Sequence, residues 1–324
     1  MGIGNRFFGI AMLSGAMLGG VVLASGCGTK SPNATSVGAG GPDELFAETA
    51  SFETVQGKPQ RVTFGLSTVD GRILHGGNVF VELQPVDGKE SSKLPAVKAS
   101  YLAVAGPATA NDPAATIGAL SDGVGVYAAT VTFPSAGFWT AKILQGNGGK
   151  VLAETAVEVR AKNAIPDVGD PAPPTQNPTL TAGKVPSVPI NRIDSRSGPD
   201  ALTELADPIL HTEVIAELIK AQRPFVVVVS TPAYCQSKFC GPITDLIEER
   251  AKTATGSDLG FVHLEVFADA TAGTVNKWSA EWIMGDGEGR EPWVFIVNRK
   301  GKIAARFDNV MTAAELDTAL ANLK

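Results

Sequence analysis

The hydrophobic pattern of the chain changes near residue 200, and this change limits the possible folds more than any other feature. Between about 46 and 161, apolar and polar residues alternate in short runs, as at Val62, Phe64 and Leu66. Such period-two runs indicate strands with one buried face. The later run 225–229 is continuously apolar, which suits a strand buried on both faces between helices. Because 324 residues exceed one ordinary core, we predict two domains, an all-β domain followed by an α/β domain.

The first domain, 46–161, is predicted to be an antiparallel β-sandwich. Asp-Gly pairs separate its strand-like segments, and their even spacing is typical of immunoglobulin-like sandwiches. Its sequence over 125–139 resembles the end of exported bacterial immunoglobulin-like domains, although its partner is unknown. The predicted strands are Arg61–Ser67, Asn78–Gln84, Val97–Ala105, Val124–Phe133, Phe138–Leu144 and Val151–Val159.

The amino terminus has the features of an export signal. One basic residue, Arg6, precedes an apolar stretch that ends in small residues before Cys27. This segment resembles a lipobox, which implies removal of residues 1–26 and acylation of Cys27. Residues 27–45 then form a tether, and the protein is extracytoplasmic and bound to the cell membrane by its lipid. A plain cleaved signal peptide with an incidental cysteine is the alternative.

Export also limits the cysteine chemistry, because disulfides persist outside the cytoplasm. The chain has three cysteines. If Cys27 carries lipid, Cys235 and Cys240 are the only pair left.

Residues 162–199 are rich in proline and lack apolar periodicity, so we predict an extended interdomain linker. The α/β domain then covers 200–324. Its predicted elements are a helix at His211–Gln222, a strand at 225–229, a helix containing Ile243 and Ile247, a strand at Gly260–Phe267, a helix near Val275–Met284, strands at Trp293–Val297 and Lys302–Phe307, and a last helix with a capping box at Thr312 and Glu315.

Two segments of this domain resemble one family. The cysteine segment 230–242 follows the first buried strand, and Glu291-Pro292 precedes the strand at 293–297. Both resemble the thioredoxin superfamily, most closely its exported TlpA/ResA branch. The resemblance implies a thioredoxin-like fold over 200–324, with Pro292 in a cis peptide bond facing the cysteines.

The same resemblance implies a thiol–disulfide oxidoreductase whose partners are protein thiols or disulfides. Cys235 attacks and Cys240 resolves, while Pro292 holds an extended substrate. Tyr234 and Trp293 are the other predicted substrate contacts, although a tryptophan here equally fits a core position.

The cysteine spacing departs from the Cys-x-x-Cys of that family. Four residues separate Cys235 from Cys240. On a regular helix, such residues lie about 140° apart around the axis, too far for a disulfide. At least one cysteine must therefore lie outside regular helix, and Pro242 fits a first helical turn just after the pair.

Two other functions stay open. The pair could be a structural disulfide in a redox-inert binding lipoprotein. The Cys-x₄-Cys spacing also occurs in peroxiredoxin Q, a thiol peroxidase. However, peroxiredoxins need a Ser or Thr three residues before the reactive cysteine, where this chain has Pro232.

Composition argues against a nucleic-acid-binding protein. The net charge is −6 and no basic cluster is present, so we expect no nucleic-acid partner.

We expect no cofactor and no metal site. His75 fits a solvated turn and His263 fits a core strand. The spacing of His263 from the cysteines does not match an SCO-type copper site. The sequence does not decide which carboxylate assists proton transfer; the candidates are Asp245, Glu265 and Asp269.

Overall fold

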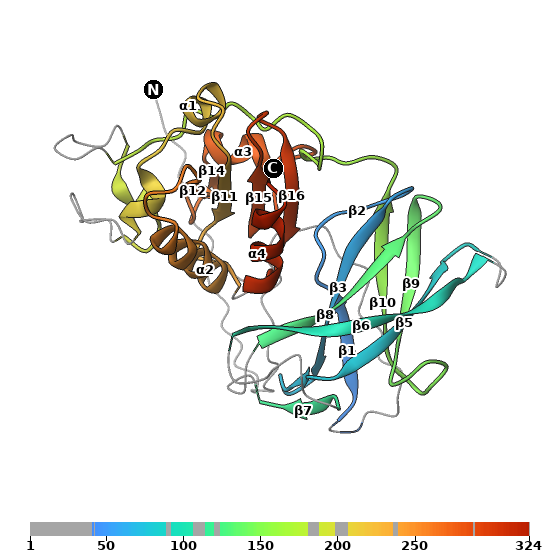
Figure 1. Ribbon diagram of the computed structural model, residues 1–324. Helices are drawn as coiled ribbons and strands as arrows, with labels where there is room; N and C mark the ends of the chain where they lie inside the picture. Colours follow the sequence, from blue (N-terminus) through green and yellow to red (C-terminus); the bar gives the residue numbers. More distant parts are fainter. Residues whose placement is uncertain are drawn as a thin grey trace, which may run out of the picture. The chain divides into compact units, whose positions relative to one another are not determined.

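The computed structural model describes residues 41, 43–88, 92–105, 114–119, 124–180, 188–197, 207–235, 239–287 and 289–323 (Figure 1). Most of the regular structure within these residues is β-strand, with few helices. Cys27, the predicted signal peptide and most of the predicted tether lie outside the described residues.

The first domain is all-β and almost entirely antiparallel. Its strands hydrogen-bond in the order β2-β10-β9-β5-β6-β8-β3-β4-β7, and β1 pairs with β3. Strand pairing therefore joins all of them in one continuous hydrogen-bonded sheet. The strands are β1 (Leu45–Thr49), β2 (Thr54–Val55), β3 (Pro59–Thr68), β4 (Ile73–His75), β5 (Asn78–Pro85), β6 (Leu94–Ala105), β7 (Thr116–Gly118), β8 (Val124–Thr132), β9 (Gly137–Leu144) and β10 (Val151–Arg160).

All six strands predicted for this domain are present, with ends that shift by at most three residues. The alternation on β3 works as expected, because Val62, Phe64 and Leu66 all lie in the core. The prediction for His75 was wrong. It lies in the short strand β4 and is only 4% exposed, with Nδ1 3.3 Å from the Tyr101 hydroxyl. A three-residue strand is too short to produce a visible hydrophobic pattern.

The second domain is α/β, with a four-stranded sheet in the order β12-β11-β15-β16. β11 and β12 are parallel, while β15 is antiparallel to both β11 and β16. The elements are 3₁₀ turns η3 (Ile190–Arg192) and η4 (Pro208–His211), helices α1 (Ile215–Lys220), α2 (Cys240–Thr253), α3 (Lys277–Ile283) and α4 (Ala313–Ala321), and strands β11 (Phe225–Ser230), β12 (Gly260–Glu265), β13 (Phe267–Asp269), β14 (Thr274–Val275), β15 (Trp293–Val297) and β16 (Ile303–Asp308).

Helices cover both faces of this sheet. Val227 and Val229 of β11 share a core with α1 and α3. Val226 and Val228 share another with α2 and α4. This explains the uninterrupted apolar run, since alternate side chains of β11 enter different helix layers. The capping box predicted at the start of α4 is also present.

The predicted linker needs a correction, because its first part packs into the α/β domain. Ile165 and Ala172 are buried in the core that contains α1 and α3. Pro171 forms a β-bridge with Lys302, and Thr175 Oγ1 accepts a 2.9 Å hydrogen bond from the Trp282 indole. Proline weakened the apolar pattern here but did not prevent burial.

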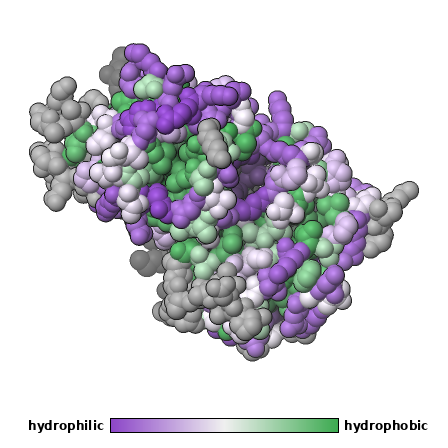
Figure 2. Space-filling view, in the orientation of Figure 1, coloured by the Kyte–Doolittle hydropathy of each residue, from purple (hydrophilic) through white to green (hydrophobic). Residues whose placement is uncertain are grey.

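The surface carries no large exposed apolar segment among the described residues. Its exposed large hydrophobic residues belong to separate segments: Val69, Val86, Phe138, Val168 and Tyr234. Figure 2 shows a mixture of hydrophilic and hydrophobic residues on the face that it draws. None of the described helices combines the length and the hydropathy that a membrane span requires.

Candidate redox site

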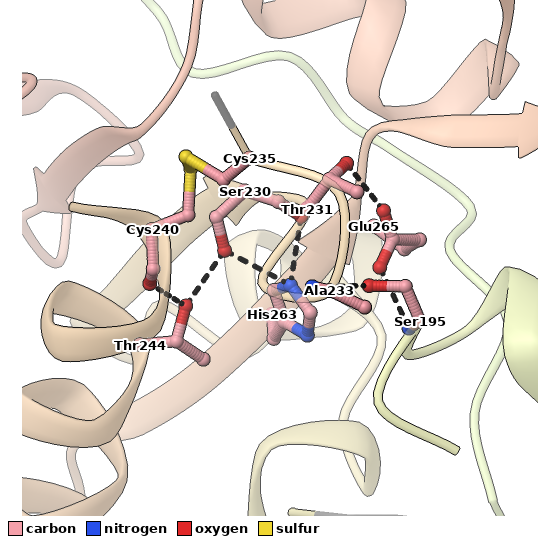
Figure 3. The surroundings of a disulfide bond; sticks show 9 residues. All are labelled: Ser195, Ser230, Thr231, Ala233, Cys235, Cys240, Thr244, His263 and Glu265. Carbon is pink, nitrogen blue, oxygen red and sulfur yellow. Dashed lines mark hydrogen bonds between the residues drawn. A yellow bond between two sulfur atoms is a disulfide. The ribbon is translucent and has the colours of Figure 1, made fainter. Parts of the chain in front are cut away.

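Cys235 and Cys240 form a disulfide at the carboxyl end of β11 (Figure 3). Cys235 lies in the turn after the strand, and Cys240 is the first residue of α2. Their Cα atoms are 5.9 Å apart. The prediction that one cysteine must lie outside regular helix is therefore confirmed. Residues 236–238 lie outside the described residues.

The two cysteines differ in burial. Cys240 is completely buried, whereas Cys235 is partly exposed and follows Tyr234, which is 59% exposed. Of the two cysteines, Cys235 is therefore the one that solvent reaches.

The position of Cys240 gives its sulfur a favourable electrostatic environment. It opens a 14-residue helix, with Gly241 and Pro242 in the same first turn. The partial positive charge of a helix amino terminus stabilises a thiolate. After reduction, this effect acts on the buried cysteine more than on Cys235, which lies outside the helix.

A chain of hydrogen bonds leads from His263 to the backbone of Cys240 (Figure 3). His263 Nε2 lies 3.0 Å from the main-chain oxygen of Ser230 and 3.1 Å from its hydroxyl. The Ser230 and Thr244 hydroxyls are 2.7 Å apart, and Thr244 donates to the Cys240 carbonyl at 2.7 Å. Because Thr244 uses its proton there, it must accept from Ser230. The Ser230 proton is thus engaged with Thr244 and not with His263, unlike a catalytic serine.

Glu265 ties the cysteine loop to the preceding chain. It accepts hydrogen bonds from the Thr231 hydroxyl and, at 2.7 Å, from the Ser195 amide. The Ser195 hydroxyl accepts a 3.2 Å bond from the Ala233 amide in the loop. Burial raises the pKa of Glu265, although the neighbouring His263 opposes that rise. Of the three carboxylates considered for proton transfer, only Glu265 belongs to this network, while Asp269 is exposed and Asp245 is largely so.

Glu291 is a second carboxyl group near Thr231; the residue is half-buried and its Oε2 atom is inaccessible to solvent. Burial raises its pKa to about 8, the charge of Glu265 adds to the rise, and hydrogen bonds with Thr231 oppose it. The peptide bond between Glu291 and Pro292 is cis, as the family resemblance implied.

The three predicted substrate contacts differ in exposure. Tyr234 is exposed beside Cys235, whereas Pro292 is buried. Trp293 is 4% exposed; its ring stacks on Phe295 at 5.7 Å between centroids, and Arg306 lies over it at 5.2 Å. Its ring surface is therefore already covered by neighbouring side chains.

The structure also contains a buried cluster that the sequence did not reveal. It shares His263 with the hydrogen bonds that lead to Cys240. Asp194, from the predicted linker, meets His211 of η4 and His263 of β12, and all three are buried. Asp194 Oδ2 lies 3.4 Å from His211 Nε2, 3.6 Å from His263 Nδ1 and 2.8 Å from Arg196 Nη2. The histidines were visible in the sequence, but nothing in the spacing could bring Asp194 to them.

The charged groups in this cluster change one another's pKa values. Burial alone would raise the pKa of Asp194, but its contacts with His211 and His263 and its hydrogen bond from Arg196 hold it far below the usual range. Burial lowers the pKa of His211 to about 4. Burial also acts to lower the pKa of His263, but Asp194 outweighs it, so the pKa of His263 is raised. Donor atoms of Asp194, His211 and His263 lie within 4.8 Å of one another, a separation that a metal ion can bridge.

No family model matches the chain, and no curated protein matches it. A solved thiol:disulfide interchange protein of the thioredoxin family from Chlorobium tepidum TLS is 14% identical, with a TM-score of 0.30, and the match covers 48% of this chain and 99% of that one. A putative lipoprotein from Bacillus anthracis is 10% identical, with a TM-score of 0.23 and coverage of 40% and 87%. The Lin-41 filamin domain is 13% identical, with a TM-score of 0.21 and coverage of 36% and 93%. TM-scores this low establish neither a shared fold nor a shared activity.

Proposed function

We propose that the chain is a membrane-tethered, extracytoplasmic protein of the thioredoxin-like class that exchanges disulfides through Cys235 and Cys240. One observation carries this proposal: the pair joins a partly exposed cysteine in a loop to a buried cysteine at a helix amino terminus. A dithiol enzyme needs this asymmetry, because one sulfur must reach the substrate while the other waits behind it.

The topology of the α/β domain supports the proposal. Strand β11, helix α2, strand β12, helix α3, the hairpin β15–β16 and helix α4 follow one another in the order of a thioredoxin core. Two parallel strands joined by a helix and followed by an antiparallel hairpin match the sheet of that core. For the first domain, we propose the immunoglobulin-like class that its antiparallel strands favour.

The exchange needs no group beyond the two sulfurs and the substrate. In the reduced protein, the Cys235 thiolate attacks one sulfur of a substrate disulfide, breaks that bond and forms a mixed disulfide. The displaced substrate sulfur takes up a proton. The Cys240 thiolate then attacks the Cys235 sulfur and releases the second substrate thiol. The substrate gains two electrons and two protons, and the protein is left with its disulfide.

The helix favours the second step. Its amino terminus stabilises the Cys240 thiolate, which is the attacking group in resolution. Because Cys240 is buried, it attacks the mixed disulfide from the protein interior. It does not react with the substrate disulfide directly.

The first experiment is a redox titration of the full mature chain in glutathione or dithiothreitol buffers. A reduction potential above about −270 mV supports exchange, whereas one below about −300 mV indicates a structural bridge and overturns the proposal. In the interval between these values, a trapping test decides. Cys240→Ser is expected to accumulate a mixed disulfide on Cys235 with a model disulfide, and Cys235→Ser is expected to form none.

The same titrated protein tests the peroxidase alternative. Rapid consumption of hydroperoxide with sulfenic acid on Cys235 would replace the exchange function with a thiol peroxidase.

We also propose that Cys27 carries the membrane anchor, on the basis of the sequence that precedes it. Mass spectrometry of the mature amino terminus is expected to show an acylated Cys27. A mature chain beginning at another residue would contradict this anchor.

A further inference from the structure

The ring of His263 is held in an orientation that leaves one nitrogen facing a carboxylate. Nε2 lies 3.0 Å from the main-chain oxygen of Ser230, which can only accept, so Nε2 carries a hydrogen. In a neutral ring, Nδ1 is then a bare lone pair. It faces Asp194 Oδ2 at 3.6 Å and has no hydrogen-bond partner among the described residues. Two electron-rich atoms therefore face each other in a buried space, and a cation must lie between them.

The distances favour a metal ion over a proton. A charged N–H···O bond to a carboxylate spans about 2.7–2.9 Å. Asp194 Oδ2 lies 3.6 Å from His263 Nδ1 and 3.4 Å from His211 Nε2, and both distances exceed that range. By contrast, two ligands of a tetrahedral Zn²⁺ with bonds of 2.0–2.1 Å are about 3.3–3.4 Å apart. One ion at the centre of the three atoms thus satisfies both long contacts.

The charge of the surroundings also favours a dication. Arg196 is the shared partner of three carboxylates, Asp194, Asp207 and Asp245. With neutral imidazoles, these four side chains carry a net charge of about −2, which one divalent ion balances. Arg196 does not fill the site, because a carboxylate oxygen has a second lone pair beside the one that Arg196 uses at 2.8 Å.

We propose that Asp194 Oδ2, His211 Nε2 and His263 Nδ1 bind a divalent transition-metal ion, with Zn²⁺ the expected occupant. Two imidazoles and a carboxylate form a borderline donor set that suits Zn²⁺ and Co²⁺. The bond from His263 Nε2 to the Ser230 carbonyl is the outer contact that usually orients a metal-binding histidine. The three donors come from separate parts of the chain, so the ion is a buried cross-link of the α/β domain.

The role assigned to this ion is structural. All three ligands are buried, and no substrate can reach them. The site uses neither cysteine, so it stands whether or not the pair exchanges disulfides.

The test uses the full mature chain with its disulfide intact, so that free thiols cannot bind metal. After chelation and dialysis, Co²⁺ is titrated first, followed by Zn²⁺ with calorimetry and elemental analysis. We expect one ion per chain, the ligand-field absorption of tetrahedral Co²⁺ without a sulfur charge-transfer band, and its loss when Zn²⁺ is added. At a Zn²⁺ concentration 100-fold above Kd, the Tm is expected to rise by about 5–10 °C.

Two variants and one control locate the ion. His263→Gln and Asp194→Asn are expected to weaken Zn²⁺ binding at least 100-fold, while His75→Gln, which changes a buried histidine of the all-β domain, leaves it unchanged. The double variant Cys235→Ser/Cys240→Ser is also expected to bind normally.

Failure of the oxidised chain to bind Co²⁺ or Zn²⁺ would overturn the proposal and leave a protonated His263 as the cation. Binding that survives both ligand variants, or that is lost in the double cysteine variant, would also overturn it. If the ligand variants do not fold, the Co²⁺ spectrum and the Zn²⁺-dependent Tm of the unchanged chain decide. None of these results depends on the reduction potential.

Discussion

The two domains bury polar groups of different kinds. Among the described residues of the all-β domain, the polar residues that are buried as a whole carry hydroxyl groups, apart from one histidine, His75, and the one carboxylate with a comparably buried side chain, Glu53, is paired with Arg306. In the α/β domain they include the carboxylates Asp194 and Glu265 and the histidines His211 and His263. Glu265 and His263 hydrogen-bond Thr231 and Ser230 before the cysteine loop, and Asp194 and His211 contact His263.

The two kinds of buried group differ in what they need from their surroundings. A buried hydroxyl needs one or two neutral partners, whereas a buried charge loses hydration worth several kcal/mol and needs paired charges to offset the loss. Tyr127 meets its need with one bond to the Gly76 carbonyl at 2.8 Å. Asp194 needs Arg196 and two histidines. Buried groups with shifted pKa values cluster at functional sites, so the comparison favours the α/β domain as the place of chemistry.

The largest expected effect is at Asp194. We predict that Asp194→Ala lowers the free energy of unfolding by about 3–5 kcal/mol, because it removes the buried carboxylate that faces His211, His263 and Arg196. Urea unfolding in the presence of chelator measures this without a contribution from metal. Glu154→Ala in the all-β domain removes a half-exposed partner of Lys142 and is expected to change stability by less than about 1 kcal/mol. Equal losses of stability in the two variants would contradict the inferred difference between the domains in how strongly they depend on charged groups.

The next effect is a dependence on pH. The pKa of Glu291 is about 8 in the folded protein and about 4.5 when unperturbed, so the folded state holds the extra proton between these values. The free energy of unfolding therefore falls as the pH rises from about 4.5 to 8, by at most about 1.4 kcal/mol per pH unit. Glu291→Gln is expected to flatten this slope in urea unfolding at pH 5, 6, 7 and 8. An unchanged slope would show that Glu291 ionises normally.

The smallest effect is expected in the all-β core. Tyr127→Phe removes the hydroxyl that donates to the Gly76 carbonyl and is predicted to cost about 1–2 kcal/mol at any pH between 5 and 8. The matched control, Tyr234→Phe, changes an exposed tyrosine and is expected to leave stability within about 0.5 kcal/mol. A strong pH dependence of the Tyr127→Phe effect would show that charges also matter in this core.

Sequence patterns predicted the elements well where a periodic signal was long. The run 225–229 and the capping box at Thr312 correspond to β11 and the start of α4. The predicted helix 211–222 is instead the 3₁₀ turn η4 followed by the short helix α1. Short strands such as β4 were missed because three residues carry no readable period.

Of the candidate site, only the disulfide between Cys235 and Cys240 was predictable from the sequence. The cysteine pair follows from counting, but its surroundings depend on contacts between distant segments. Ser195 reaches Glu265 across 70 residues, and Asp194 reaches His263 across 69. Asp194 and Ser195 lie in a proline-rich stretch whose composition predicted a solvated linker. Tertiary contacts override composition there, as they do for Ala172.

Two described parts of the chain between residues 162 and 211 pack beside the edge strands of the four-stranded sheet. Pro171 bridges Lys302 at the start of β16, where the Ala172 amide bonds to Gly301 and the Ile303 amide to Asp170. At the opposite edge, η4 packs beside β12. Exposed edge strands invite pairing with strands of other molecules, which leads to aggregation. These contacts cover the start of β16 and one side of β12, and so reduce the room for strand addition at these two places.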